Sequence, residues 1–138
     1  MIKKPIVETS FHVLLPRGRR IFVPLKGGSC KIFRCIRPHS YYTILKAALD
    51  QKGFLPNQDH TLVLLGDAFD RGPETIELAN FLPSLYGQGQ LVYIRGNHED
   101  LLERCILQLA RGDSPYGIAS SYHATNGTWD TLLTLAGM

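Results

Sequence analysis

The sequence predicts an α/β protein built on a small parallel sheet, preceded by a short pair of strands. Short apolar runs alternate with longer segments whose apolar residues recur at helical spacing, which is typical of this fold class. Two strongly polar loops each follow directly on a predicted strand. The chain has 138 residues, of which 44% are hydrophobic. This is about one ordinary domain, with enough apolar side chains to bury a core.

The beginning of the chain differs in composition from the rest. Apolar residues on both sides of Pro16-Arg17-Gly18-Arg19 predict two short strands that form a hairpin. The Gly-Gly-Ser sequence at 27–29 is typical of a linker. We therefore expect an N-terminal extension over residues 1–30 and a separate domain over residues 31–138.

Three short segments are expected to form the sheet. Residues 31–36 predict its first strand. Residues 62–65 are wholly apolar, which suits a central strand that is buried on both faces. Residues 91–94 form a third strand of the same kind. Because helical segments separate these strands, we expect them to run parallel, with their carboxyl ends at one edge of the sheet.

The first two helices follow the first two strands. Residues 41–52 place their apolar side chains on one helical face, and Gly53 is well placed to end that helix. The second helix should begin at Pro73, because proline is favoured at the first helical position. Pro83 should kink or end it, since proline lacks the N–H that the helix interior needs.

The third and fourth helices occupy the last part of the chain. Glu99 and Asp100 suit the first turn of the third helix, and Arg111-Gly112 suits its end. A fourth helix is expected over residues 128–136. The side chains expected to face inward are Leu101, Leu102, Cys105, Ile106 and Leu109 in the third helix and Trp129, Leu132, Leu133 and Ala136 in the fourth.

The two polar loops contain most of the side chains that can carry chemistry. Gly66-Asp67-Ala68-Phe69-Asp70-Arg71-Gly72 follows the second strand, and Gly96-Asn97-His98-Glu99-Asp100 follows the third. Such residues are also common in ordinary turns and surface ion pairs. At two successive strand ends, however, they bring carboxylate, amide, imidazole and guanidinium groups to one edge, which favours a functional site.

Each of these groups suits one task in the hydrolysis of a phosphate ester. Asp67 offers an oxygen ligand that could bridge two divalent cations, and Asn97 offers a neutral oxygen ligand. Arg71 can donate two hydrogen bonds to phosphate oxygens. His98 can donate a proton near neutral pH, and Asp70 can hold its imidazole. We therefore assign catalysis to His98, Asp70 and Arg71, and substrate binding to Arg71, Asn97 and His98.

The motif Gly-Asp-x-x-Asp-Arg-Gly, followed by Gly-Asn-His-Glu, resembles the calcineurin-like metallophosphoesterases. Within them it is similar to the serine/threonine protein phosphatase branch and its bacterial relatives. The resemblance implies that residues 31–138 form part of the family's sandwich, a β-α-β-α-β-α core. It also implies two divalent metal ions (manganese, iron or zinc), with Asp67 bridging both and Asn97 on the second. By the same resemblance, His39 binds the first ion.

Two features depart from the family's pattern. Arg37 stands where the family has a metal-binding aspartate, and a cation cannot ligate a metal, so we expect a weakened first metal site. The family's later metal-binding histidines have no counterpart, which predicts that the chain is the amino-terminal part of such an enzyme. His123 follows, and we interpret it as a polar loop residue; no chemical role is expected for His60 or His12.

The leading interpretation is a metal-dependent phosphatase that hydrolyses phosphate monoesters by metal-activated hydroxide, with phosphoserine and phosphothreonine among the candidate substrates. The alternative is a truncated, inactive remnant that binds phosphate or a protein partner. The expected partner is a phosphorylated protein or small molecule.

Other classes of partner are not expected. The net charge is only +3, and its basic excess, concentrated before residue 38, lacks a recognisable nucleic-acid-binding module. No apolar run is long enough to span a bilayer, and no signal peptide is evident, so a cytoplasmic location is expected. Cys30, Cys35 and Cys105 are odd in number and lack metal-site spacing, and the last two suit buried thiols.

Overall fold

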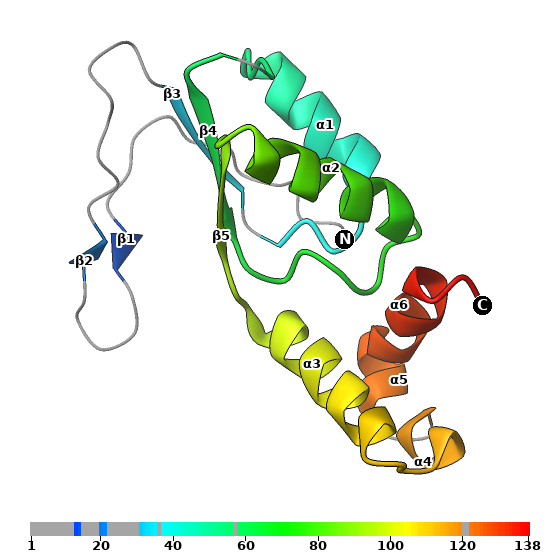
Figure 1. The fold of residues 1–138 in the computed structure, drawn as a ribbon. Coiled ribbons are helices and arrows are strands. Elements are labelled where there is room, and N and C mark those ends of the chain that lie inside the picture. Colours follow the sequence, from blue (N-terminus) through cyan, green and yellow to red (C-terminus); the bar gives the residue numbers. More distant parts are fainter. Residues whose placement is uncertain (1–12, 15–19, 22–30, 36, 57, 120–121) are drawn as a thin grey trace.

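The computed structural model describes residues 13–14, 20–21, 31–35, 37–56, 58–119 and 122–138 (Figure 1). Strands β1 (Val13–Leu14) and β2 (Arg20–Ile21) pair antiparallel. This pairing confirms the predicted pair of strands at the start of the chain. The expected linker lies outside the described residues, and the domain boundary at residue 30 stays a prediction.

The main sheet has three parallel strands in the order β3-β4-β5. These are β3 (Lys31–Cys35), β4 (His60–Leu65) and β5 (Leu91–Ile94). The central position predicted for the second strand is confirmed, because Leu62, Val63 and Leu64 of β4 are each at most 1% exposed. The sheet and its helices confirm the predicted α/β class.

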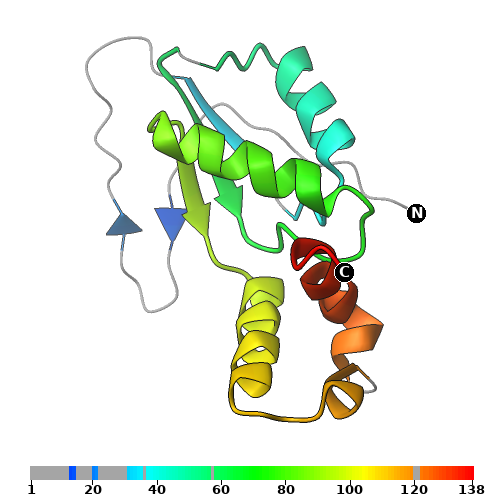
Figure 2. The ribbon, with the colours of Figure 1, turned by 45° about the vertical axis from the view of Figure 1, so that its right-hand side comes forward.

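Two helices cover one face of this sheet. Both α1 (Tyr42–Gln51) and α2 (Thr75–Gly87) lie on the same side of the strands (Figures 1 and 2). Strand order follows chain order, so two successive right-handed crossovers place both helices on the same face.

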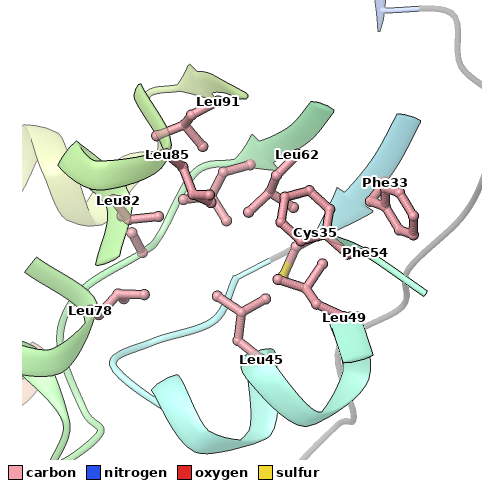
Figure 3. Packing of buried hydrophobic residues seen from close by; sticks show 12 residues of the cluster. Phe33, Cys35, Leu45, Leu49, Phe54, Leu62, Leu78, Leu82, Leu85 and Leu91 are labelled. Carbon is pink, nitrogen blue, oxygen red and sulfur yellow. The ribbon is translucent and has the colours of Figure 1, made fainter. Parts of the chain in front are cut away.

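The apolar core lies between these helices and the sheet (Figure 3). Phe33 and Phe54 pack edge to face, with ring centroids 5.1 Å apart. Cys35 is a packed thiol, and its burial raises its pKa to about 12. Cys35 and Cys105 are both free and buried, as expected. The other core residues are Leu45, Leu49, Leu62, Leu64, Ala68, Leu78, Leu82, Leu85 and Leu91.

The expected start of α2 was wrong, and the helix does not end at Pro83. The helix begins at Thr75, two residues after Pro73, and it continues through Pro83 to Gly87. Pro83 lies on the exposed face of α2, where water can bind the carbonyl group that lacks its helical N–H donor. Burial of Leu78, Leu82 and Leu85 on the other face stabilises the helix past the proline.

Four helices follow the sheet. After α3 (Asn97–Ala110) come α4 (Pro115–Ala119), α5 (Tyr122–Asn126) and α6 (Thr128–Leu135). Helix α3 leads away from the sheet, and α4, α5 and α6 bring the chain back toward it. As a result α6 contacts both α3 and α2 (Figures 1 and 2). Helices α4 and α5 were not predicted, because five residues are too few to show an amphipathic period. No helix in the described ranges is long and apolar enough to cross a membrane.

Some of the inward-facing positions expected in the last helices were wrong. Ile106 is 47% exposed, whereas Leu101 and Cys105 are buried as expected. In α6 the buried positions are Thr128 and Thr131. The four residues expected to face inward, Trp129, Leu132, Leu133 and Ala136, are only partly buried or exposed. Helix α6 contacts α2, α3 and α5, and its first residue, Thr128, faces Asp70 in the loop after β4.

Two histidines of the described residues lie outside the strand-end loops, and both have structural settings, whereas His12 lies outside the described residues. His123 is 1% exposed within α5, and its Nε2 lies 3.1 Å from Gln108 Oε1, so its interpretation as a loop residue was wrong. His60 begins β4, and its Nδ1 accepts a hydrogen bond from the Leu55 N–H at 2.8 Å.

Candidate active site

The loops that follow β3 and β4 have unusual backbone conformations. Six non-glycine residues of the described chain have positive φ, and all of them lie in these two loops: Arg37, His39, Ser40, Asp67, Asp70 and Arg71. Each costs ~1 kcal/mol or more and persists only where the surrounding structure holds it. Such residues concentrate at functional sites.

The two loops are held together backbone to backbone. The His39 N–H donates to the Asp67 carbonyl at 3.1 Å, and the Ser40 N–H donates to the Ala68 carbonyl at 2.7 Å. A Cβ on Gly72 would overlap the His39 carbonyl oxygen and lie 2.6 Å from the Ser40 carbonyl carbon. Only glycine therefore allows this close approach of the loops.

Glu99 joins the ends of β4 and β5. Its Oε2 accepts the N–H groups of Asp67 at 2.8 Å and Gly96 at 2.7 Å. Its Oε1 accepts the Ala68 N–H and the Tyr93 hydroxyl, both at 2.7 Å. Burial and the bond to Glu99 raise the pKa of Tyr93, so its hydroxyl stays a donor.

From the sequence, Glu99 was expected only in the first turn of a helix, and this role was not predicted. Its position three residues after Gly96, the N-cap of α3, is the spacing of a capping box. That spacing was the available signal for the bond to the Gly96 N–H. No sequence pattern near Glu99 indicated its bonds to the N–H groups of Asp67 and Ala68, because these residues lie in the loop after the neighbouring strand β4.

His39, Asp67 and His98 form a cluster of metal-ligand type at this edge of the sheet. Each offers one ligand atom, and these atoms all lie within 4.8 Å of one another. Asp67 Oδ1 accepts the His98 backbone N–H at 3.0 Å. The two imidazole rings meet edge to face, with centroids 4.9 Å apart.

Hydrogen bonds fix the orientation of both imidazoles. Nδ1 of His98 donates to Asp70 Oδ2 at 2.7 Å, and the two side chains are only 4% and 0% exposed. Nδ1 of His39 lies 3.3 Å from the Phe69 carbonyl oxygen, which can only accept, so this nitrogen carries the proton. In each ring Nε2 remains for an ion or a proton, as is usual for histidines that bind metals.

The electrostatic setting favours neutral His39. Burial lowers the pKa of His39, and the charges of His98 and Arg71 lower it further. The bond to the Phe69 carbonyl and the charge of Asp67 act in the opposite direction but do not reverse the shift. Neutral imidazole is the form that ligates metal ions.

Thr128 connects α6 to this site. Its hydroxyl donates to Asp70 Oδ2 at 2.7 Å, the same oxygen that holds His98, and Thr128 is fully buried. Asp70 Oδ1 has no partner among the described residues. Thr128 was not predicted as a site residue, because no local pattern marks a threonine that reaches a carboxylate so distant in the chain.

Replacing Thr128 with valine tests this contact, since valine keeps the shape and removes the hydroxyl. We expect the free energy of unfolding to fall by roughly 1.5–3 kcal/mol, the range for a hydrogen bond to a charged group. Urea unfolding measures the change. Thr134→Val in the same helix is the matched control, because its hydroxyl bonds an exposed backbone carbonyl. Equal losses in the two variants would contradict the assigned contact.

Arg37 lies against the carboxylate of the cluster. Its Nε is 3.2 Å from Asp67 Oδ2, and the side chain of Arg37 is 68% exposed. The three side chains fit at most a single divalent ion: Asp67 and neutral His39 would ligate it, and His98 Nε2 would either complete the set or carry a proton, but not both. They do not fit a pair of ions, because within the described part of the chain Asp67 is the only carboxylate of the cluster and Arg37 occupies one of its oxygens.

The structure brings together four of the six predicted site residues: His39, Asp67, Asp70 and His98. Arg71 is exposed but close enough for its charge to lower the pKa of His39. Asn97 is the exposed first residue of α3, and no hydrogen bond of its side chain occurs within the described residues. Its role as a metal ligand, like the catalytic roles of the others, stays a prediction.

Comparison with known proteins places this site in a family. The sequence model described as Calcineurin-like phosphoesterase matches residues 37–137, most of the chain. The chain belongs to the calcineurin-like phosphoesterase family. The resemblance noted in the sequence is thereby confirmed, and the matched range includes both polar loops and the helices that follow them. This is a family of dinuclear, metal-dependent phosphoesterases.

Curated relatives within the calcineurin-like phosphoesterases match at modest identity. The asymmetrical bis(5'-nucleosyl)-tetraphosphatase PrpE of Bacillus velezensis is 33% identical over 73 residues, 48% of this chain and 29% of that protein. The symmetrical bis(5'-nucleosyl)-tetraphosphatase of Pseudomonas fluorescens is 37% identical over 83 residues, 58% of this chain and 26% of that protein. Serine/threonine-protein phosphatase 2 of Escherichia coli is 36% identical over 61 residues, 44% and 26% of the two chains.

The chain therefore spans less than a third of the length of each of these relatives. No solved structure matches the chain.

Proposed function

We propose that this site hydrolyses phosphate esters. The observation that carries the proposal is the buried His98–Asp70 pair, joined at 2.7 Å, next to the cluster of His39 and Asp67. A histidine held by a carboxylate beside a metal-ligand cluster is suited to proton transfer to an oxygen leaving group. Membership of the phosphoesterase family supports the same chemistry.

In this proposal each residue has one task. Asp70 holds Nδ1 of His98 and stabilises the imidazolium form, and Nε2 donates the proton to the leaving oxygen. Arg71 binds the phosphate oxygens with its guanidinium. Asp67, with His39, holds a divalent ion, for which manganese, iron and zinc are the candidates. Such an ion supplies Lewis-acid polarisation of the phosphate.

The substrate class is proposed from the relatives. Two of those described above are named as bis(5'-nucleosyl)-tetraphosphatases, so a dinucleoside tetraphosphate is the first substrate to test. Phosphoserine and phosphothreonine come second, because one relative is named as a serine/threonine-protein phosphatase. Generic aryl phosphate serves as a reference for unspecific phosphatase activity.

His98→Asn and Asp70→Asn test the proposal. Assays of the 138-residue chain with manganese should show turnover that falls by about 10²–10⁴-fold in His98→Asn, the usual contribution of a positioned acid. The fall should be in kcat, with KM nearly unchanged, because neither substitution removes the phosphate contact assigned to Arg71. Asp113→Asn, on an exposed residue past α3, is the control and should behave as wild type. Equal activity of His98→Asn and wild type would contradict the proposal.

The second candidate is an inactive chain that binds phosphate or a protein partner. The Arg37–Asp67 pair favours it, because a guanidinium on the central carboxylate weakens cation binding there. A wild-type chain that binds inorganic phosphate, but turns over none of the three substrates with manganese, iron or zinc, would establish this alternative.

A further inference from the structure

We propose that the Arg37 guanidinium takes the place of one cation at this site and binds phosphate directly, so that the chain holds one divalent ion. This inference rests on the proposed function, because it concerns the same phosphate and the same carboxylate. It differs from a two-ion centre in both the number of ions and the group that contacts phosphate.

Both carboxylate oxygens of Asp67 already have partners. Its Oδ1 accepts the His98 N–H at 3.0 Å, and its Oδ2 lies 3.2 Å from Arg37 Nε. Asp70, the nearby carboxylate, bonds His98 and Thr128 through Oδ2; its Oδ1 has no partner among the described residues, but Asp70 is not part of the cluster of ligand atoms. A carboxylate oxygen has two lone pairs, so Oδ1 can accept the His98 N–H and still ligate one ion, whereas a further ion at Oδ2 would have to displace the guanidinium.

The balance of charge around Asp67 also opposes a second ion. Asp67 and Arg37 neutralise each other, and one divalent ion balances a phosphate dianion. A second divalent ion would leave an excess of positive charge around one carboxylate, with Arg71 adding more at the same edge. At such short separations like charges repel by kilocalories per mole even at a partly hydrated surface, which opposes the second ion.

The geometry of Arg37 suits a direct contact with phosphate. Its backbone has φ 53°, and the adjoining His39 and Ser40 also have positive φ. Two backbone bonds fix this segment on the loop after β4. The terminal amino groups of Arg37 have no partner among the described residues, and the side chain is 68% exposed. These free N–H donors match the fork geometry that binds phosphate oxygens.

Calorimetry with inorganic phosphate on chelator-treated protein tests the phosphate contact. Wild type should bind phosphate without a metal ion. Arg37→Gln should weaken this binding by roughly tenfold or more, the loss expected for a charge-assisted contact, and Arg37→Asp should weaken it further. Arg111→Gln is the matched control, because Arg111 is an exposed arginine at the opposite end of α3 from the site. Arg111→Gln should bind as wild type does.

Titration with manganese tests the number of ions. Wild type should take up one ion per chain, whereas Arg37→Asp should bind manganese more tightly or take up a second ion. Two ions in wild type, or equal phosphate affinity of wild type and Arg37→Gln, would overturn the inference. If wild type gives one of these results and still hydrolyses its substrate, the proposed function stands. If Arg71→Gln loses phosphate binding while Arg37→Gln keeps it, the phosphate contact belongs to Arg71 instead.

Discussion

Replacing Glu99 with alanine is expected to lower the free energy of unfolding by roughly 3–5 kcal/mol, because four hydrogen bonds to one carboxylate are lost. Three of the donors are backbone N–H groups in the tight loops at the ends of β4 and β5. Without the carboxylate, Asp67 loses the bond that orients its backbone, so manganese affinity should fall as well. Urea unfolding and calorimetry measure the two effects.

Glu103→Ala is the matched control for this change. Glu103 lies one turn further along α3, and its carboxylate pairs with the exposed Arg95 side chain, so its removal should alter stability little. Glu99→Gln should fall between wild type and Glu99→Ala, since glutamine keeps one accepting oxygen. Hydrogen exchange of the Asp67 and Ala68 amides should become faster in Glu99→Ala. Unchanged exchange there would show that Glu99 does not hold the loop.

Gly72→Ala is expected to cost about 3 kcal/mol or more, at the upper end of the range for overpacking. The added Cβ would overlap the backbone of His39 and Ser40, and backbone atoms cannot turn aside as a flexible side chain can. The loop that carries His39 must therefore separate from the loop that carries Asp67. Because both residues belong to the metal-ligand cluster, manganese affinity should drop together with stability.

Gly87→Ala serves as the control for the added methyl group. A Cβ at Gly87 meets nothing within 4 Å, and this glycine ends α2 without positive φ. Alanine should therefore be tolerated there or slightly stabilising. If Gly72→Ala binds manganese as tightly as Gly87→Ala does, the contact between the two loops does not determine the arrangement of the metal-ligand cluster.

The order and type of the main elements could be predicted because they depend on local periodicity. The strands at 62–65 and 91–94 were expected from short apolar runs, and the structure has them in β4 and β5. Parallel pairing followed from the helices between them. The limits of α2 could not be predicted, because burial of its leucines against the sheet outweighs the local effect of Pro83.

The convergence of polar groups was also open to prediction, since parallel strands end at one edge. His39 and Asp67 come from the loops after β3 and β4, His98 comes from the first turn of α3 after β5, and their ligand atoms meet within 4.8 Å. The contact of Asp70 with the His98 imidazole was expected and is present, but the other contacts that orient these groups were not open to prediction. Thr128 reaches Asp70 from a helix 58 residues further along the chain, and no sequence spacing encodes that distance.

The sequence by itself determined the three parallel strands, the edge at which they end and the residue types delivered to it, because periodicity and the handedness of crossovers act locally. Beyond the expected pair of Asp70 and His98, only the tertiary structure decided which contacts orient those groups. The Glu99 bonds across two strands, the Thr128 hydroxyl on Asp70 and the Arg37 guanidinium on Asp67 all join segments distant in sequence. Such contacts arise from packing in three dimensions, where a hydrogen-bond partner is selected by position rather than by spacing along the chain.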